Sequence, residues 1–172
     1  LGSLLIVSFF WSQRPDTFMT TRNWLNITQQ VSILCVISFT MTLVMVGGDF
    51  DLSVGSMASL SGMIAAVLWQ QDVSLFGALG TALLVGAFGG VFNGVLVAYA
   101  GLSAFVATLG TLTIFSGLAL LVSNGKTIFG RAIPEIVGDF SRGGIPLAEG
   151  IQLPNLTLIA ILVLILMGII LQ

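Results

Sequence analysis

The stretch that decides the fold is VSLFGALGTALLVGAFGGVFNGVLVAYAGLSAFVATLGTLTIFSGLALLVSNG, residues 73–125, which contains no charged side chain. A helix needs about 20 apolar residues to cross a hydrocarbon core of roughly 30 Å, so the stretch is long enough for two crossings. It divides at residues 99–103, Tyr-Ala-Gly-Leu-Ser, where glycine and serine favour a turn. We therefore predict membrane-spanning helices near 75–98 and 104–123.

The composition of the whole chain agrees with a membrane protein. Of its 172 residues, 56% are hydrophobic and 7% are charged, whereas soluble domains are about 25% charged. The net charge of −2 without a basic run gives no surface for nucleic acid. Histidine is absent, which excludes Ser-His-Asp catalysis and most zinc sites. We predict an all-α, polytopic transmembrane helical bundle that is not an enzyme and holds no cofactor or metal.

The remaining uncharged stretches predict further spans near 25–47, 53–70 and 156–172. Residues 1–11 are apolar but too short to cross, and they lack the basic start of a signal peptide, so we interpret them as part of a truncated helix. The chain also ends inside an apolar segment. The one long loop, 124–155, is expected to contain a short interfacial helix at 132–140, with apolar residues on one face.

Two carboxylates lie in the connection between the spans at 25–47 and 53–70. In the structural interpretation, Gly47 and Gly48 end one helix, and Asp51 or Ser53 caps the next. In the functional interpretation, these four residues and Asp49 form a hinge or gate beside a permeation path, because an unpaired carboxylate is costly inside a membrane. Both interpretations remain open from the sequence.

An intramembrane aspartyl protease is an unfavoured alternative. Such enzymes place aspartate in a Gly-x-Gly-Asp motif and need a second aspartate on another helix. Gly47-Gly48-Asp49 lacks this spacing, and the remaining aspartates lie in predicted connections.

Small residues recur at every fourth position in two of the predicted spans. Such stripes let helix backbones approach closely, which is a main source of helix association in membranes. We predict packing within one bundle, with a dimer interface as the alternative, for Ala58, Gly62 and Ala66 and for Gly86, Gly90 and Gly94.

Neutral hydrogen-bonding side chains inside the spans are candidates for a translocation path. Asn93 lies among glycines in the middle of one span, and Thr108 and Thr111 share a face of the next. Each could bond to a neighbouring helix or to its own backbone. They could instead line a path for an uncharged, polyhydroxylated solute, since ion conduction normally uses charged side chains. No phosphate-binding glycine motif is present, so any energy source is expected on a partner chain.

The segment 51–56, Asp-Leu-Ser-Val-Gly-Ser, with the residues before it from Met41, resembles the signature of permease subunits in ribose-, xylose- and arabinose-type ABC sugar importers. The resemblance covers nearly the whole chain but only about the N-terminal half of such a permease. Further segments agree in order and spacing: 93–97, 103–111, 116–119, 123–128 and 144–146.

The resemblance implies that residues 1–172 are a partial transmembrane permease domain in the cell inner membrane. Its expected partners are a second permease subunit, ATP-binding cassette ATPases, a periplasmic sugar-binding protein and the lipid bilayer. The implied function is ATP-driven import of a pentose or hexose. A passive channel subunit for small neutral solutes is the alternative.

The membrane orientation of the long loop depends on which indication is followed, and the chain differs from that family in two respects. The arginines and Lys126 lie in the first and long loops, which the positive-inside rule would place in the cytoplasm. The resemblance implies that the long loop is periplasmic, and we follow it. The family usually has arginine where this chain has Ser116, and the loop that contacts the ATPase belongs to the half that is not present.

Overall fold

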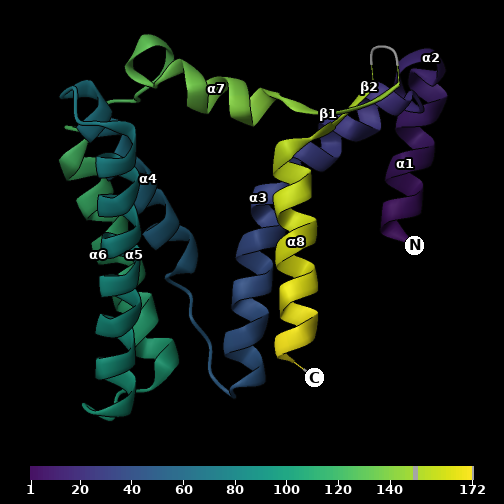
Figure 1. Cartoon of the computed structure of the whole chain (residues 1–172). Coiled ribbons are helices and arrows are strands. Elements are labelled where there is room, and N and C mark those ends of the chain that lie inside the picture. Colours follow the sequence, from purple (N-terminus) through teal and green to yellow (C-terminus); the bar gives the residue numbers. More distant parts are fainter. Residues whose placement is uncertain (149–150, 172) are drawn as a thin grey trace. The chain divides into compact units, whose positions relative to one another are not determined.

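The computed structural model describes residues 1–148 and 151–171, and its secondary structure is mainly helical. Glu149 and Gly150 of the predicted long loop, and Gln172 of the last predicted span, lie outside the described residues. The elements in chain order (Figure 1) are α1 (Gly2–Gln13), α2 (Pro15–Phe18), α3 (Thr21–Val46), α4 (Val54–Gln70), α5 (Leu75–Ala98), α6 (Ala104–Val122), η1 (Gly130–Ala132), α7 (Glu135–Arg142), β1 (Gly144–Ala148), β2 (Ile151–Pro154) and α8 (Asn155–Ile170).

The helices lie close to the predicted ranges, and the all-α bundle class is confirmed apart from one short hairpin. Among the described residues, α3, α5 and α6 are long and apolar enough to cross a membrane. The helices α4 and α8 are apolar but contain 17 and 16 residues. Membrane crossing by these two shorter helices therefore stays a prediction.

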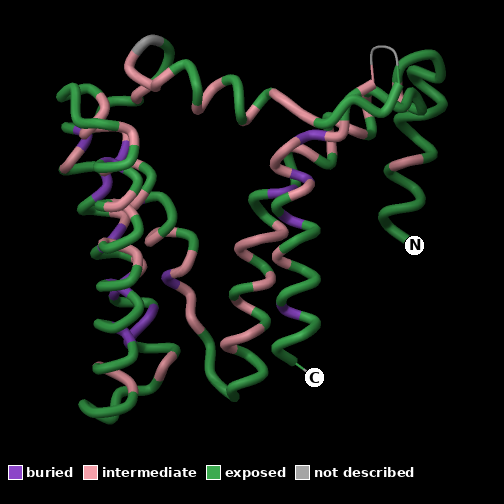
Figure 2. The backbone as a smooth tube through the Cα atoms, in the orientation of Figure 1, coloured by how far each residue is buried: buried purple, intermediate pink, exposed green. Residues whose placement is uncertain are grey.

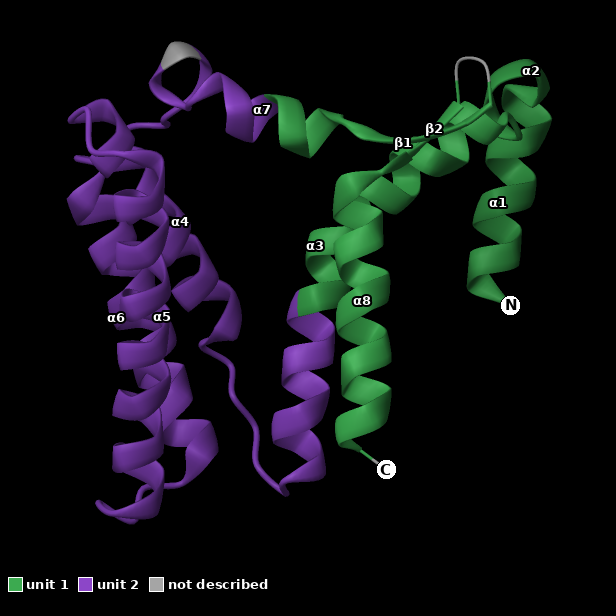
Figure 3. Cartoon of the chain, viewed as in Figure 1, with its two compact units in different colours: residues 1–36, 139–172 green, residues 37–138 purple. Residues whose placement is uncertain are grey.

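The chain divides into two compact units, which Figure 3 colours separately. Unit 1 consists of residues 1–36 and 139–172, and unit 2 of residues 37–138.

In unit 2, α4 packs against α5 and α6. The core contains Leu60 of α4 with Phe115 and Ala119 of α6, and Met57 and Ile64 pack against it. These α4 positions repeat at three- and four-residue intervals, so they share one helix face. Buried residues are few along the tube of Figure 2, and large apolar side chains cover the outside. Such a surface is typical of helices that face lipid or other membrane helices.

In unit 1, the first half of α3 lies beside α8, and hydroxyl groups connect them. The Thr157 hydroxyl donates to Thr28 Oγ1 over 3.3 Å, and the Ser32 hydroxyl lies 3.3 Å from Thr157 Oγ1. Ser32 also donates to the Thr28 carbonyl oxygen at 2.6 Å. Because Ser32 and Thr157 are buried, these bonds join the two apolar helices through polar groups that face each other.

The prediction of an interfacial helix at 132–140 is wrong in its boundaries. The helix in this loop is α7, which begins at Glu135. Proline disfavours helical geometry in the residue before it, and Ile133, which precedes Pro134, is extended (φ −101°, ψ 128°). The pairing of β1 with β2 was not predicted at all. At Gly144 an added Cβ would overlap the Leu153 carbonyl group, so this strand pair requires glycine there.

The small-residue stripes do not form the closest helix contacts of unit 2. Gly90 and Gly94 face open space within the chain, as does Gly62, whereas Gly86 lies at van der Waals distance from Ser61. The closest approach is at buried Gly89, where an added Cβ would overlap the Met57 side chain. The helix face that makes the close contact at Gly89 has the same four-residue period as both stripes. Spacing alone therefore could not show which face is in contact.

We predict that Gly89→Leu destabilises the bundle by roughly 1–3 kcal/mol, because overpacking displaces Met57 and Phe115. Gly89→Ala should have a smaller effect, since the Met57 thioether can move aside. Thermal unfolding in detergent, followed by circular dichroism, measures both. Gly80→Leu, in the same helix but with open space around it, is the control and should leave stability unchanged or slightly raised. Equal effects at Gly80 and Gly89 would contradict the packing.

Candidate functional site

The site is built on the interruption between α3 and α4. The helix α3 ends at Val46, and Gly48 takes the left-handed conformation (φ +93°) that ends many helices. The Asp49 amide then donates to the Val44 carbonyl oxygen at 3.3 Å. The chain continues without helical hydrogen bonding to Val54, as the glycine pair indicates. Polar backbone groups are therefore released between two apolar helices.

The Asp51 carboxylate provides hydrogen-bond acceptors for polar groups in this interruption. Its Oδ1 accepts hydrogen bonds from the Ser53 amide at 2.8 Å and from the Ser53 hydroxyl at 2.6 Å. Ser53 immediately precedes α4, but its side chain accepts no hydrogen bond from the helix backbone. The structure thus shows a tight Asp51–Ser53 turn at the helix start instead of the N-cap bond that a serine at this position usually makes.

Asn93 of α5 reaches this turn from the neighbouring helix. Its amide nitrogen donates to Ser53 Oγ at 2.7 Å and lies 3.5 Å from Asp51 Oδ2. The side chains of Ser53 and Asn93 are both buried, with residue exposures of 2% and 5%. The Asn93 Oδ1 atom is also buried and has no hydrogen-bond partner among the described residues. A buried acceptor without a donor costs about 1–3 kcal/mol, so this oxygen is a place where a hydroxyl group would be stabilised.

Thr108 joins the same connection to α6. Its hydroxyl lies 2.7 Å from the Ala104 carbonyl oxygen and 3.3 Å from the Phe50 carbonyl oxygen. The Thr111 hydroxyl donates to the Thr108 carbonyl oxygen at 3.2 Å, within α6. Both threonines are buried. Thr108 therefore bonds across elements, whereas Thr111 makes its bond inside its own helix.

A cavity of about 280 Å3 lies beside these side chains, inside unit 2. Four of the candidate residues carry polar side chains on its wall: Asp49, Asp51, Asn93 and Thr108. Gly90 and Gly94 also line it, whereas Gly47 and Gly48 end α3 and Thr111 is buried within α6. The lining residues that the sequence gave no reason to select are Val44, Phe50, Val97, Ala98 and Ala104. Phe50 takes part through its carbonyl oxygen, which residue type cannot reveal.

The arrangement is suited to binding neutral polar groups. It presents two carboxylates, an amide and a hydroxyl among the apolar residues and glycines that line the cavity. Among the described residues there is no group of three His, Cys, Asp or Glu side chains that could hold a metal ion. The structure thus has apolar membrane-type helices with polar side chains gathered in an open cavity at a helix break. This defines a multi-pass membrane protein with a polar site at that break.

Comparison with known proteins identifies the class further. Residues 23–172 match the family model described as "Branched-chain amino acid transport system / permease component", and the chain belongs to this family. It is 38% identical over 127 residues to the D-allose transport system permease protein of Escherichia coli K12, covering 73% of this chain and 39% of that protein. It is 35% identical over 128 residues to the ribose import permease protein of the same strain, covering 74% and 40%.

A third relative is the autoinducer 2 import system permease protein of Escherichia coli O9:H4, which is 37% identical over 113 residues, covering 66% of this chain and 33% of that protein. The resemblance to ribose-type ABC permeases is thereby confirmed. The chain spans about two fifths of the length of the allose and ribose relatives. No solved structure matches it significantly.

We predict that Asn93→Ala lowers the free energy of unfolding by about 1–3 kcal/mol, because it leaves Asp51 and Ser53 with unfilled hydrogen bonds in a buried place. Thr81→Ala is the matched control on the same helix, since Thr81 is exposed and bonds only to the Gly77 carbonyl oxygen. It should change stability by less than about 0.5 kcal/mol. Thermal unfolding in detergent compares the two, and equal losses would contradict the buried network.

Proposed function

We propose that the chain is the membrane-embedded permease part of an ATP-driven, binding-protein-dependent importer of a small sugar. The observation that carries the proposal is the buried Asp51–Ser53–Asn93 network with its unpartnered Asn93 oxygen beside the internal cavity. Family membership and the names of the allose and ribose relatives support it.

The chemistry of the network favours a sugar over an ion. A sugar hydroxyl both donates and accepts hydrogen bonds, so it can donate to Asn93 Oδ1 and to a free lone pair of Asp51. Asn93 and Thr108 carry no charge, and the only charged side chains on the cavity wall are the two aspartates of the connection. Ion conduction would be expected to use rings of charge or backbone carbonyl groups instead.

The connection between α3 and α4 is proposed as the gate, with Gly47, Gly48, Asp49, Asp51 and Ser53 as its residues. It is held to α5 by the Asn93 bonds and to α6 by the Thr108 contact with the Phe50 carbonyl oxygen. Few hydrogen bonds therefore need to break for it to move. Interrupted helices at a binding site are a recurring device of transporters, because they place polar backbone where it lines a cavity.

The proposed partners supply functions for which this chain contains no sequence motif. No nucleotide-binding motif occurs in the sequence, so ATP hydrolysis is assigned to separate ATPase subunits. A periplasmic sugar-binding protein and a second permease subunit complete the proposed assembly in the cell inner membrane. The stripe Ala58–Gly62–Ala66, whose first two residues are exposed, is proposed for contacts between permease chains, where small residues allow close helix packing.

We predict that Asp51→Ala reduces sugar uptake at least roughly tenfold, because hydrogen bonds to a charged group contribute about 1.5–3 kcal/mol and tenfold corresponds to about 1.4. Asp51→Asn should recover most uptake, since its carbonyl oxygen can still accept from Ser53. Labelled ribose and allose are supplied to cells that express the permease with its ATPase and binding protein.

Asp16→Ala is the control for that experiment. Asp16 is exposed, carries the same charge and lies outside both the proposed gate and the cavity wall. It should retain most of the uptake, with expression checked by immunoblot. Normal uptake by Asp51→Ala at normal expression would rule out a role for the Asp51–Ser53 turn in gating.

The passive-channel alternative makes an opposite prediction about partners. If the importer function is right, uptake disappears when either the ATPase or the binding protein is deleted. Uptake that persists without both, and that follows the external sugar concentration without accumulation, would favour the channel.

A further inference from the structure

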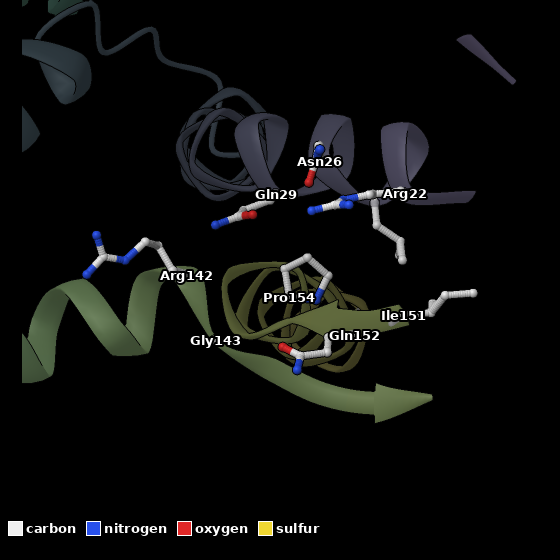
Figure 4. A pocket seen from close by; sticks show the side chains of 9 residues that line it. Arg22, Asn26, Gln29, Arg142, Gly143, Ile151, Gln152 and Pro154 are labelled. Atoms are coloured by element: carbon white, nitrogen blue, oxygen red, sulfur yellow. The ribbon is translucent and has the colours of Figure 1, made fainter. Parts of the chain in front are cut away.

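A second cavity, of about 320 Å3, lies wholly inside unit 1 and is separate from the site described above. Figure 4 shows its two sides: Arg22, Asn26 and Gln29 project from α3, opposite the segment Ile151–Pro154 of β2, with Arg142 at the end of α7. Its size falls in the range of about 300–1,000 Å3 that small-molecule sites occupy. Nothing in the proposed transport function uses it.

The charge of this cavity has one sign. Two of its lining residues are arginines, and none of the described residues that line it is acidic. Arg142 makes a 3.3 Å ion pair with Asp139, and both side chains are about three quarters exposed, at 75% and 77%. Exposed pairs of this kind are weak, so the Arg142 guanidinium is free to turn toward an anion. Guanidinium groups bind phosphate oxygens in two-point contacts.

Three amide side chains add neutral hydrogen-bonding groups: Asn26, Gln29 and Gln152. Gln29 donates to the Ser141 carbonyl oxygen at 2.6 Å, which fixes the end of α7 against α3. The arginines are thereby held near the same cavity from two different helices. Amides next to cationic groups suit a ligand that carries both an anionic phosphate and free hydroxyl groups.

The surroundings place this cavity at the boundary between polar and apolar regions. Two residues along α3 from Arg22, the Trp24 ring meets Phe18 edge-on at 6.0 Å, and Phe18 stacks on Phe10 at 6.0 Å. Aromatic side chains gather at membrane–water interfaces. Beyond the cavity, α3 and α8 expose large apolar side chains, among them Ile33, Leu34, Ile161 and Leu162. Acyl chains can cover these while a headgroup occupies the cavity.

We propose that this cavity binds the phosphate headgroup of an anionic phospholipid, with Arg22 and Arg142 on the phosphate and the three amides on headgroup hydroxyls. Lipids whose headgroups carry choline or ethanolamine are disfavoured, because their cation would approach two arginines, and none of the described lining residues offers it a carboxylate. The exposed apolar side chains of α3 and α8 favour a lipid, whose acyl chains can cover them. A free oxyanion has no acyl chains and would leave them exposed.

The test uses the chain purified in detergent and equilibrated with equal amounts of phosphatidylglycerol and phosphatidylcholine, with retained lipid measured by native mass spectrometry. We expect preferential retention of phosphatidylglycerol. Arg22→Gln should reduce it roughly fivefold, since each interfacial arginine contributes about 1 kcal/mol toward anionic lipid. Arg22→Lys should retain most of the binding. Arg14→Gln, with the same charge change outside the cavity, is the matched control.

A second variant, Asn26→Asp, places a carboxylate in the cavity and should abolish the preference even if Arg22→Gln proves difficult to purify. Inorganic phosphate, titrated against the retained lipid, separates the two possible sources of phosphate. Displacement of phosphatidylglycerol by millimolar phosphate would overturn the lipid assignment in favour of a free-oxyanion site. Equal retention of both lipids, or equal loss in Arg14→Gln and Arg22→Gln, would overturn the proposal. So would variants that weaken only binding of a soluble acidic partner.

Discussion

The structure of unit 2 depends on one constraint: polar groups released among apolar helices must find partners, because no water is available to bond them in a hydrocarbon environment. The amides of residues 47–49 still bond to the last turn of α3, and the interruption frees the backbone amides of residues 50–53 from helical hydrogen bonding. The Asp51 carboxylate binds the Ser53 amide and hydroxyl, and Asn93 and Thr108 reach the same segment from α5 and α6. These hydrogen bonds offset the cost of unpaired polar groups among apolar helices. They also join α5 and α6 to the connection that precedes α4.

The same constraint explains why the junction can serve transport. A network that leaves one acceptor, Asn93 Oδ1, without a donor is less stable than a complete one, and an arriving hydroxyl can complete it. The connection between α3 and α4 is held by few hydrogen bonds. Each joins two neutral groups or a neutral donor and the Asp51 carboxylate, so the connection can change conformation without separating a buried ion pair. The site and the proposed gate therefore share Asp49 and Asp51, which line the cavity and belong to the connection.

The second polar region follows a different principle. At the ends of α3 and α8, arginines and amides lie beside aromatic rings and above exposed aliphatic side chains. The site in unit 2 carries two carboxylates and presents acceptors, whereas this cavity is cationic and presents donors. The two units thus carry different polar sites, for which we propose solute hydroxyls in unit 2 and lipid phosphate in unit 1.

The sequence by itself determined the membrane class, the helix ranges and the position of the interruption. These properties depend on local apolarity, on the spacing of charges and on a glycine pair. All three can be recognised in the sequence without knowledge of the tertiary contacts. It also selected Asp51, Ser53, Asn93 and Thr108, because polar residues in apolar surroundings are conspicuous.

Only the tertiary structure decided which of them meet. Helix period gives several faces the same four-residue spacing, so Gly89, and not Gly90 or Gly94, marks the closest contact. The role of the Phe50 carbonyl oxygen, the β1–β2 pairing and the convergence of Arg22 with Arg142 depend on backbone paths between residues far apart in the chain. Local patterns carry no information on such paths, because they are set by packing.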